Sequence, residues 1–323
     1  MKIVEVMPIK KGLLKEDLTY FSGQDVNEGD LVAIPIRGSS AKGIITEVKP
    51  IYEAKSKIKT KDWTLKKISR VIHSNYLQPE TIKAIKNSAD YFVTQPGEIL
   101  GAIIPKSIWE NDLKINRYQA DPKEIIIPET SCLQETTNER LSRYKALIRE
   151  SFAKRQSVFI CVPTVSEIEK IARNLSKGIE NYIFVGHGDL SPKEQLATWK
   201  NSLELNHPIL FIGTPLFLGL PRQDIATIII ERENSSHYKT FSRPFVDWRF
   251  IIEEICQQNK KRLVLGDNAL RSETIYRLGK REISPLGTLK YRFVSKAKNQ
   301  LITLEENSED KFNTISERLK ERI

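Results

Sequence analysis

Four side chains of types that serve as acids, bases or metal ligands lie in the second half of the chain, namely His187, Asp189, His237 and Asp267. A metal site or an acid–base pair needs partners at fixed spacing, and neither histidine has a second His, a Cys or paired carboxylates near it in the sequence. A histidine held in a turn is therefore the favoured interpretation. Residues 235–237 lack the G-x-S-x-G turn of a hydrolase nucleophile, so no catalytic residue and no metal ligand is predicted.

The three cysteines, Cys132, Cys161 and Cys256, are widely spaced and form no C-x-x-C pair. We therefore expect reduced, buried thiols, with no zinc site and no disulfide. No apolar run approaches the roughly 20 residues needed to span a bilayer, and charged residues interrupt the N-terminus where a signal peptide would be apolar. The expected location is the cytoplasm.

The elements that must position these residues change character along the chain. Residues 1–110 contain short strand-like runs broken by turn residues, followed by a helix predicted at 79–92, so this part reads as a small β-rich domain. Residues 111–135 are polar and contain two prolines, which predicts a linker. From 136 to 285, amphipathic helices alternate with buried strands, the pattern of a parallel α/β sheet. Residues 286–323 are predicted as an αβ tail.

Polar and glycine-containing turns follow several of the predicted parallel strands. Ligands of such sheets bind at the carboxyl ends of the strands, so we expect any ligand at this edge. The turns concerned are 162–164, 186–188, 213–214 and 266–267.

Charge is the first positive indication of a partner. The formal net charge is +10, and residues 42–86 contain eleven basic and four acidic side chains. Such a segment suits a polyanion, because neutralised phosphates release their counterions. A solvated lysine-rich surface explains the same composition equally well. The basic strip predicted to bind DNA consists of Lys55, Lys57, Lys59, Lys61, Lys66 and Lys67.

An aromatic cluster lies between residues 238 and 250, interleaved with basic residues. Single-stranded nucleic acid binds to such clusters by stacking bases on rings while Lys and Arg contact phosphates. We predict this role for Tyr238, Lys239, Phe241 and Arg243, which precede the next predicted helix. For Phe245, Trp248 and Phe250, a place in the protein core is equally compatible with the sequence.

The order of short motifs resembles the PriA family of replication-restart helicases over nearly the whole chain. The N-terminal matches are L-T-Y at 18–20, N-E-G-D-L-V-A-I-P-I at 27–36, K-G-I-I-T-E-V at 42–48, A-D-Y-F at 89–92 and G-E-I-L at 97–100. The α/β matches are C-V-P-T-V at 161–165, G-H-G-D-L-S at 186–191, I-G-T-P at 212–215, E-R-E-N-S-S-H-Y-K at 231–239 and G-D-N-A-L-R-S-E-T at 266–274. The resemblance implies a 3′ DNA-binding domain followed by one RecA-like lobe, with the tail leading toward a second lobe that this chain lacks.

The same alignment implies that the nucleotide site is degenerate. Residues 137–141 fall on the phosphate-binding loop but contain no glycine and no Lys-Thr pair, and Arg232 stands where the family has its catalytic Glu. Loss of ATP and Mg²⁺ binding and of ATPase activity is therefore expected, as in a pseudoenzyme. The degenerate site comprises Thr137, Asn138, Glu139, Arg140, Leu141, Glu231, Arg232 and Glu233.

The pocket that holds a DNA 3′ end in the family is partly retained. Tyr20 keeps the family's tyrosine, Arg37 and Gly38 occupy its glycine turn, and Lys66 falls at its lysine. Thr19 replaces the acidic residue that lies near the 3′-hydroxyl. This change favours general phosphate binding over strict end recognition.

Three functions remain open from the sequence. The first is a non-catalytic protein at the nucleoid that binds forked or single-stranded DNA in replication restart or repair, with primosome or replisome proteins as further partners. The second is one half of a split ATP-dependent 3′–5′ helicase, whose other lobe is a separate subunit. The third is a non-catalytic replisome scaffold whose basic surface is incidental. No membrane partner is expected.

Overall fold

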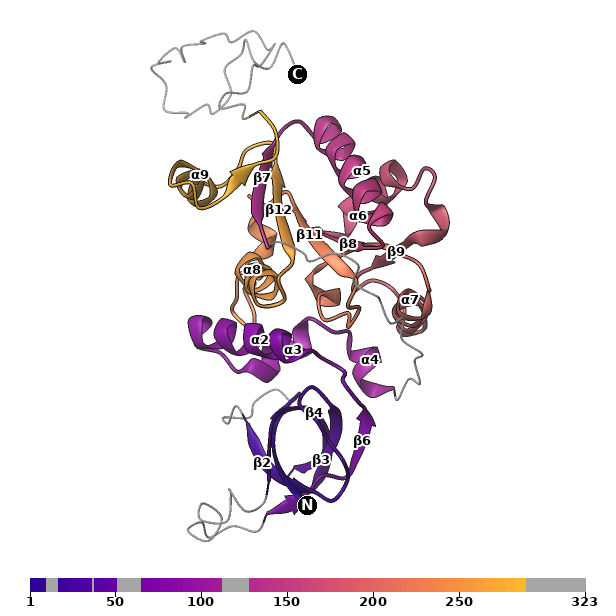
Figure 1. Ribbon diagram of the computed structural model, residues 1–323, viewed down its shortest axis with the longest axis vertical. Coiled ribbons are helices and arrows are strands. Elements are labelled where there is room, and N and C mark those ends of the chain that lie inside the picture. Colours follow the sequence, from indigo (N-terminus) through magenta and orange to yellow (C-terminus); the bar gives the residue numbers. More distant parts are fainter. Residues whose placement is uncertain (10–16, 37, 51–64, 112–127, 289–323) are drawn as a thin grey trace, which may run out of the picture. The chain divides into compact units, whose positions relative to one another are not determined.

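The computed structural model describes residues 1–9, 17–36, 38–50, 65–111 and 128–288 (Figure 1). The N-terminal part forms a six-stranded sheet in the order β5-β2-β1-β4-β3-β6. Its strands are β1 (Lys2–Pro8), β2 (Leu18–Ser22), β3 (Leu31–Ile36), β4 (Ser39–Pro50), β5 (Lys66–Lys67) and β6 (Arg70–His73).

Side chains of alternating strand positions fill the interior of this sheet. Val4, Val6, Tyr20, Ile34 and Ile45 are all buried in one apolar cluster, as the two-residue period of a strand requires. The segment after β5 closes the sheet, because the Ile68 amide donates to the Phe21 carbonyl at 3.0 Å and the Ser69 amide donates to the Ala33 carbonyl at 2.8 Å. The predicted β-rich domain is confirmed.

Three helices follow this sheet: α2 (Pro79–Phe92), α3 (Pro96–Ala102) and α4 (Lys106–Glu110). Helix α2 begins with Pro79 at its first position, where the missing N–H costs nothing, and buries Ile82, Ile85 and Ala89 along one side. The predicted helix 79–92 is therefore confirmed at both ends.

The second sheet is entirely parallel, with strand order β13-β7-β12-β11-β8-β10-β9. Helices α5 and α6 cover one face, packed on an apolar cluster that includes Tyr144 and Ile160, while α7 and α8 pack in the cluster on the other face. The strands are β7 (Thr130–Gln134), β8 (Ser157–Cys161), β9 (Ile183–Gly186), β10 (Leu210–Gly213), β11 (Ile225–Glu231), β12 (Arg262–Asp267) and β13 (Ser284–Pro285). The helices are α5 (Thr137–Ala153), α6 (Val165–Leu175), α7 (Pro192–Glu204), α8 (Trp248–Gln258) and α9 (Ser272–Gly279).

The predicted parallel α/β lobe is confirmed, but the predicted linker is too long. Residues 130–134, placed in the linker by sequence, form β7 and pair with β12 inside the parallel sheet. The sequence did not predict this strand because polar residues flank it. It is buried because the neighbouring strands β12 and β13 pair with it. The rest of the predicted linker, from 112 to 127, and the tail from 289 lie outside the described residues.

The N-terminal helices pack closely on the α/β lobe. Apolar side chains of α2, α3 and α4 share one cluster with α7, α8 and the sheet. Polar contacts join the same surfaces: Thr81 Oγ1 donates to Asn259 Oδ1 at 3.0 Å, and Ser107 Oγ donates to Gln195 Oε1 at 2.6 Å. Residues 1–289 accordingly form one compact unit. None of the described helices is long and apolar enough to cross a membrane.

Replacing Gly29 by Ala should destabilise the fold strongly. Gly29 has a φ of +88°, and an added Cβ would lie 2.0 Å from the Leu77 carbonyl oxygen. Left-handed backbone and overpacking together predict a loss of about 2–4 kcal/mol in the free energy of unfolding. Gly38→Ala is the matched control, because Gly38 has a φ of +81° with no atom within 4 Å of an added Cβ. Its loss should be only about 1–2 kcal/mol. Equal shifts of the urea midpoint in the two variants would contradict this account.

Candidate functional site

The carboxyl edge of the parallel sheet, where any ligand is expected, has no glycine-rich phosphate-binding loop between β7 and α5. Strand β7 ends at Gln134 and helix α5 begins at Thr137, so only Glu135 and Thr136 connect them. A phosphate cradle needs a longer glycine-rich turn whose backbone N–H groups surround the ligand. Residues Thr137, Asn138, Glu139, Arg140 and Leu141, aligned with that loop from the sequence, all lie inside α5.

The Glu139 side chain caps the first turn of α5. Glu139 Oε2 accepts hydrogen bonds from the Thr136 amide at 3.0 Å and from Thr136 Oγ1 at 2.8 Å. The N-terminus of a helix attracts anions, and here a carboxylate of the chain itself takes that place.

Arg140 is buried at the centre of this edge, with an exposed fraction of 1%. Its Nε and Nη2 donate to the two carboxylate oxygens of Glu231 at 3.1 and 2.5 Å, and its Nη1 donates to the Glu135 carbonyl at 2.6 Å and to Asn268 Oδ1. Burial lowers the pKa of Arg140, but the hydrogen bonds and charge of Glu231 outweigh it, so the net pKa is raised and the guanidinium is charged. Its partners are the last residue of β11 and the residues that directly follow β7 and β12, so this one side chain ties three strand ends together.

Tyr144 completes the set of partners of Glu231. Its hydroxyl donates to Glu231 Oε2 at 2.7 Å, and burial, followed by the charge of Glu231, raises the pKa of Tyr144 well above its usual value. Gly266 is required beside it, because an added Cβ would lie 1.9 Å from the Tyr144 hydroxyl. Both oxygens of Glu231 are thus engaged by protein donors.

The two residues after Glu231 are also engaged. Arg232 is exposed and pairs with Glu167 at the start of α6. Glu233 is buried, accepts a hydrogen bond from the Arg271 amide at 2.6 Å, and has a pKa raised by that burial. Within the described parts of the chain, no group of three or more His, Cys, Asp or Glu side chains is arranged to hold a metal ion.

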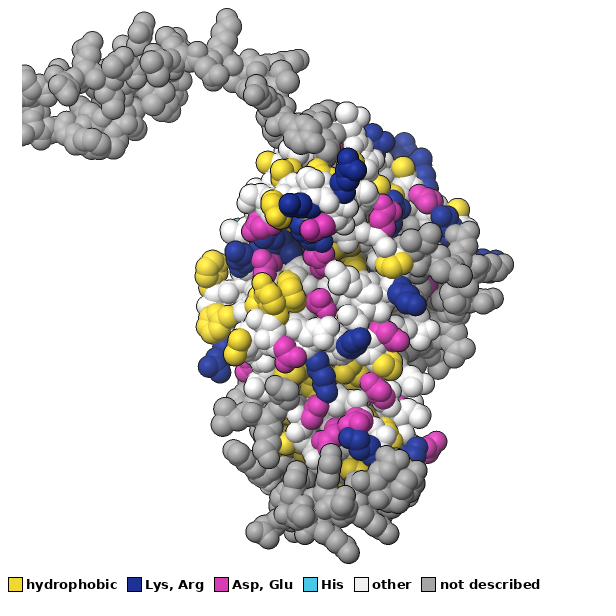
Figure 2. All heavy atoms as spheres, turned by 60° about the vertical axis from the view of Figure 1, so that its left-hand side comes forward, with side chains coloured by type: hydrophobic (Ala, Val, Ile, Leu, Met, Phe, Trp, Pro, Cys, Tyr) yellow, Lys and Arg dark blue, Asp and Glu magenta, His cyan; other side chains and the backbone are white. Residues whose placement is uncertain are grey.

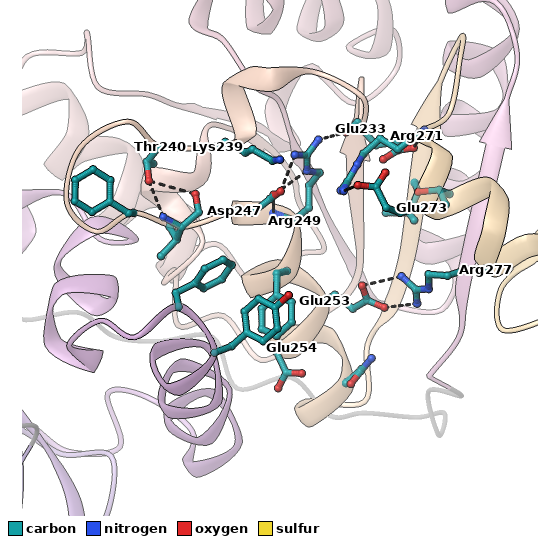
Figure 3. Close-up of a pocket in the computed structure, with 18 residues that line it drawn as sticks. Glu233, Lys239, Thr240, Asp247, Arg249, Glu253, Glu254, Arg271, Glu273 and Arg277 are labelled. Carbon is teal, nitrogen blue, oxygen red and sulfur yellow. Dashed lines mark hydrogen bonds and ion pairs between the residues drawn. The ribbon is translucent and has the colours of Figure 1, made fainter.

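A second site is a hollow of about 820 Å³ between α2, α8, α9 and the loop that precedes α8 (Figure 3). We call it the aromatic hollow, because Tyr91, Phe92, Phe245 and Phe250 line it. Tyr91 is stacked on Phe250 with ring centroids 4.1 Å apart. On the face shown in Figure 2, exposed hydrophobic side chains gather beside Lys and Arg side chains.

The structure corrects the prediction for Tyr238. Its ring is fully buried, and its hydroxyl lies within hydrogen-bond distance of the Cys161 carbonyl at 2.9 Å and the Glu231 carbonyl at 2.8 Å. A ring in this position cannot stack on a base. Phe241, in contrast, is 88% exposed, and Lys239 and Arg243 are also exposed.

For three further aromatic residues, the sequence left both DNA stacking and a core position possible, and their burial differs. Trp248 is buried in the core, Phe245 is 59% exposed, and Phe250 is half-buried beneath Tyr91. Tyr91 itself was missed as a site residue. The signal was present: it lies two residues after Ala89, off the buried side of α2, and an aromatic ring there must face outward.

The predicted 3′-end residues are only partly gathered in the described structure. Tyr20 is a core residue whose hydroxyl donates to the Pro35 carbonyl at 3.1 Å, and burial raises its pKa. Lys66 and Lys67 are exposed on β5, beside Tyr20 and Phe21 of β2. Gly38 lies in an exposed turn. The predicted residues Arg37, Lys55, Lys57, Lys59 and Lys61 lie outside the described residues.

Thr19, which replaces the family's acidic residue, donates its hydroxyl to the Glu5 carboxylate at 3.0 and 3.1 Å. Burial raises the pKa of Glu5, an effect that the hydrogen bond from Thr19 counters. A carboxylate is therefore present beside residue 19, although it comes from β1.

The described chain consists of a β-sheet module joined to one parallel α/β lobe. Residues 6–105 match the family model of the 3′ DNA-binding domain of PriA. The replication restart protein PriA of Rickettsia prowazekii is 23% identical over 300 residues, covering 86% of this chain and 44% of that protein. PriA of Helicobacter pylori strain J99 is 24% identical over 266 residues, covering 77% of this chain and 40% of that protein. The predicted resemblance to PriA is confirmed.

The chain spans about two fifths of the length of these PriA relatives. Among solved structures, the UvsW helicase from bacteriophage T4 aligns with a TM-score of 0.35 and 13% identity, covering 73% of this chain and 87% of that chain.

Proposed function

We propose that this chain is a DNA-binding protein of replication restart that recognises forked or single-stranded DNA and does not hydrolyse ATP. The observation that carries the proposal is the match of residues 6–105 to a 3′ DNA-binding domain. In the same chain, the buried side chain of Arg140 occupies the carboxyl edge of the parallel sheet. The two halves of the statement rest on different parts of the chain and are tested separately.

Exposed lysines support DNA binding by the N-terminal module. Lys66 and Lys67 project from a two-residue strand at the edge of the sheet, next to β2. Ammonium groups in such positions contact phosphates without reading bases, which gives binding that depends little on sequence. The lysines of residues 55–61 extend the same basic strip along the chain.

The filled edge of the sheet supports the absence of hydrolysis. Phosphoryl transfer depends on a loop that cradles the phosphates, a metal ion, and a carboxylate free to position water. Two residues connect β7 to α5, and both oxygens of Glu231 accept hydrogen bonds from Arg140 and Tyr144. A nucleotide would have to displace a buried ion pair to enter, which opposes its binding.

The Thr19–Glu5 pair bears on the recognition of a 3′ end. A 3′-hydroxyl can donate to a carboxylate, and Glu5 offers one next to Thr19. We therefore propose that a free 3′ end at a fork adds to the affinity that phosphate contacts supply. The loss of the acidic residue at position 19 had predicted general phosphate binding alone.

The test compares three labelled DNAs: a fork with a free 3′ end at the branch, the same fork with that end phosphorylated, and a plain duplex. We expect the order free end, blocked end, duplex in affinity, with no phosphate release from ATP above buffer in any sample. Equal affinity for the two forks would remove the 3′-end part of the proposal. DNA-stimulated phosphate release that disappears in Glu231→Gln would overturn the claim of no hydrolysis, whereas release that persists in this variant indicates a contaminant.

A further inference from the structure

A hollow of about 390 Å³ lies at the amino ends of the parallel strands, on the opposite side of the sheet from its carboxyl edge. We call it the amino-end hollow. Ile225, the first residue of β11, and Lys261, which directly precedes β12, both line it. Residues 74–78, which lead into α2, and Thr81 in the first turns of that helix line it as well. A molecule bound here therefore contacts both the N-terminal part and the parallel lobe.

Apolar side chains of the core form part of the lining of the amino-end hollow. Phe159, Leu220, Ile228 and Ile255 are all buried and belong to the cluster on that face of the sheet. A concave site with apolar walls and a few polar groups, in the range of about 300–1,000 Å³, is usual for small ligands. The hollow therefore has the size and the walls of a site for a small molecule with an apolar body.

Among the described residues, Arg222 and Lys261 are the charged side chains that line the hollow, and only Arg222 has a counter-charge. Its Nε and Nη2 donate to the two carboxylate oxygens of Asp224 at 2.7 and 3.0 Å. Lys261 Nζ donates to the Ile225 carbonyl at 2.7 Å, and no carboxylate of the described chain forms an ion pair with it. Burial lowers the pKa of Lys261, because the ammonium loses solvation. The hollow thus holds one ammonium that lacks a counter-ion.

We propose that the amino-end hollow binds a small apolar carboxylate, with the carboxylate on Lys261 Nζ and the apolar body against Phe159 and Leu220. An ammonium carries three N–H donors, so two remain for the oxygens of a bound carboxylate after the one given to Ile225. A single ammonium matches a single negative charge. A phosphate dianion would leave a second charge unpaired beside apolar walls, which is costly.

This site is separate from the proposed DNA-binding function and has a consequence of its own. A ligand that binds only the folded protein stabilises it by mass action. Because the hollow is lined by both parts of the chain, the bound carboxylate stabilises the packing of the N-terminal helices on the parallel lobe. That packing then responds to the concentration of the carboxylate.

The test uses 4-benzoylbenzoate, an aromatic carboxylate that cross-links under ultraviolet light, and its neutral amide, 4-benzoylbenzamide. Calorimetry on the full chain should show that the carboxylate binds and that the amide binds roughly 10- to 100-fold more weakly, the effect of losing a hydrogen bond between charged groups. Lys261→Met should weaken binding of the carboxylate by a similar factor. Lys260→Met is the matched control, because Lys260 is exposed and does not line the hollow. Its affinity should stay within twofold of wild type.

Photo-cross-linking of wild type locates the carboxylate without any substitution, so the test holds even if Lys261→Met does not fold. Mass spectrometry should find the label on peptides that contain residues 74–81, 218–228 or 255–261. The inference is overturned if the carboxylate does not bind wild type, if carboxylate and amide bind equally, or if the label lies outside these peptides. Equal affinities of folded Lys261→Met and Lys260→Met would overturn it too. None of these results bears on the binding of DNA.

Discussion

Replacing Arg140 by Ala should lower the free energy of unfolding by about 3–5 kcal/mol, because the change leaves the buried Glu231 carboxylate without its counter-charge. Glu231 is only 3% exposed, so water cannot take the place of the guanidinium. The Glu135 carbonyl and Asn268 Oδ1 lose a donor in the same step. A loss of this size is a large part of the 5–15 kcal/mol that stabilises a typical domain.

Arg143→Ala is the matched control for this prediction. Arg143 lies one turn further along α5, its side chain is 54% exposed, and its pair with Glu135 is long at 3.5 Å. The Glu135 carboxylate is buried but the Arg143 guanidinium is open to water, so this long pair is weaker than the buried one, and the variant should lose clearly less stability than Arg140→Ala. Both variants remove the same charge from the same helix. A difference between them therefore reports the burial of the ion pair.

A double replacement tests the explanation further. Arg140→Met combined with Glu231→Leu removes both charges, and apolar replacement of a buried pair is often nearly neutral. The double variant should recover part of the stability lost in Arg140→Ala, short of full recovery because the Tyr144 hydroxyl loses its acceptor. Urea unfolding followed by circular dichroism measures all four proteins. An Arg140→Ala midpoint equal to that of Arg143→Ala would show that the ion pair does not hold the strand ends together.

The sequence predicted the elements of both parts well where local signals are strong. Pro79 and the buried side of α2 fix that helix, and apolar runs such as 225–230 predict buried strands of a parallel sheet. Strand β7 was missed because it is short, lies among polar residues, and is stabilised by its neighbours β12 and β13. Pairing between segments more than a hundred residues apart leaves no local signal.

The candidate sites show the same limit. The sequence indicated that the phosphate loop was lost, but the ion pair that fills the edge joins Arg140 to a residue 91 positions away. Tyr238 was predicted to lie in the loop before the next helix, yet the short 3₁₀ helix Ser236–Tyr238 turns its ring into the core. The stacked rings of Tyr91 and Phe250 come together only because α2 packs on α8.

The second prediction with a large expected effect concerns how the affinity for DNA depends on salt concentration. If the basic strip binds DNA through phosphates, each contact should contribute a slope of roughly −0.7 to −0.9 in log K against log salt concentration. Six such contacts predict about a 10³-fold loss of affinity between 50 and 200 mM salt. Neutralising Lys57, Lys66 and Lys67 to Gln should weaken binding on every sequence and flatten the slope by about 2–3 units.

The matched control removes the same charge elsewhere. Lys170, Lys177 and Lys193 are exposed on the parallel lobe and outside the predicted strip. Their triple replacement by Gln lowers the net charge equally, so a general effect of charge would appear in both triple variants. Only loss of specific phosphate contacts should flatten the slope in the first variant and leave it unchanged in the control.

The most direct measurement is therefore the affinity of wild type for a labelled fork over a series of salt concentrations, without nucleotide. The account predicts binding at physiological salt that weakens steeply as salt rises, with the slope reduced only by the Lys57, Lys66 and Lys67 replacements. No binding to the fork at physiological salt, or an affinity that does not change with salt, would contradict it.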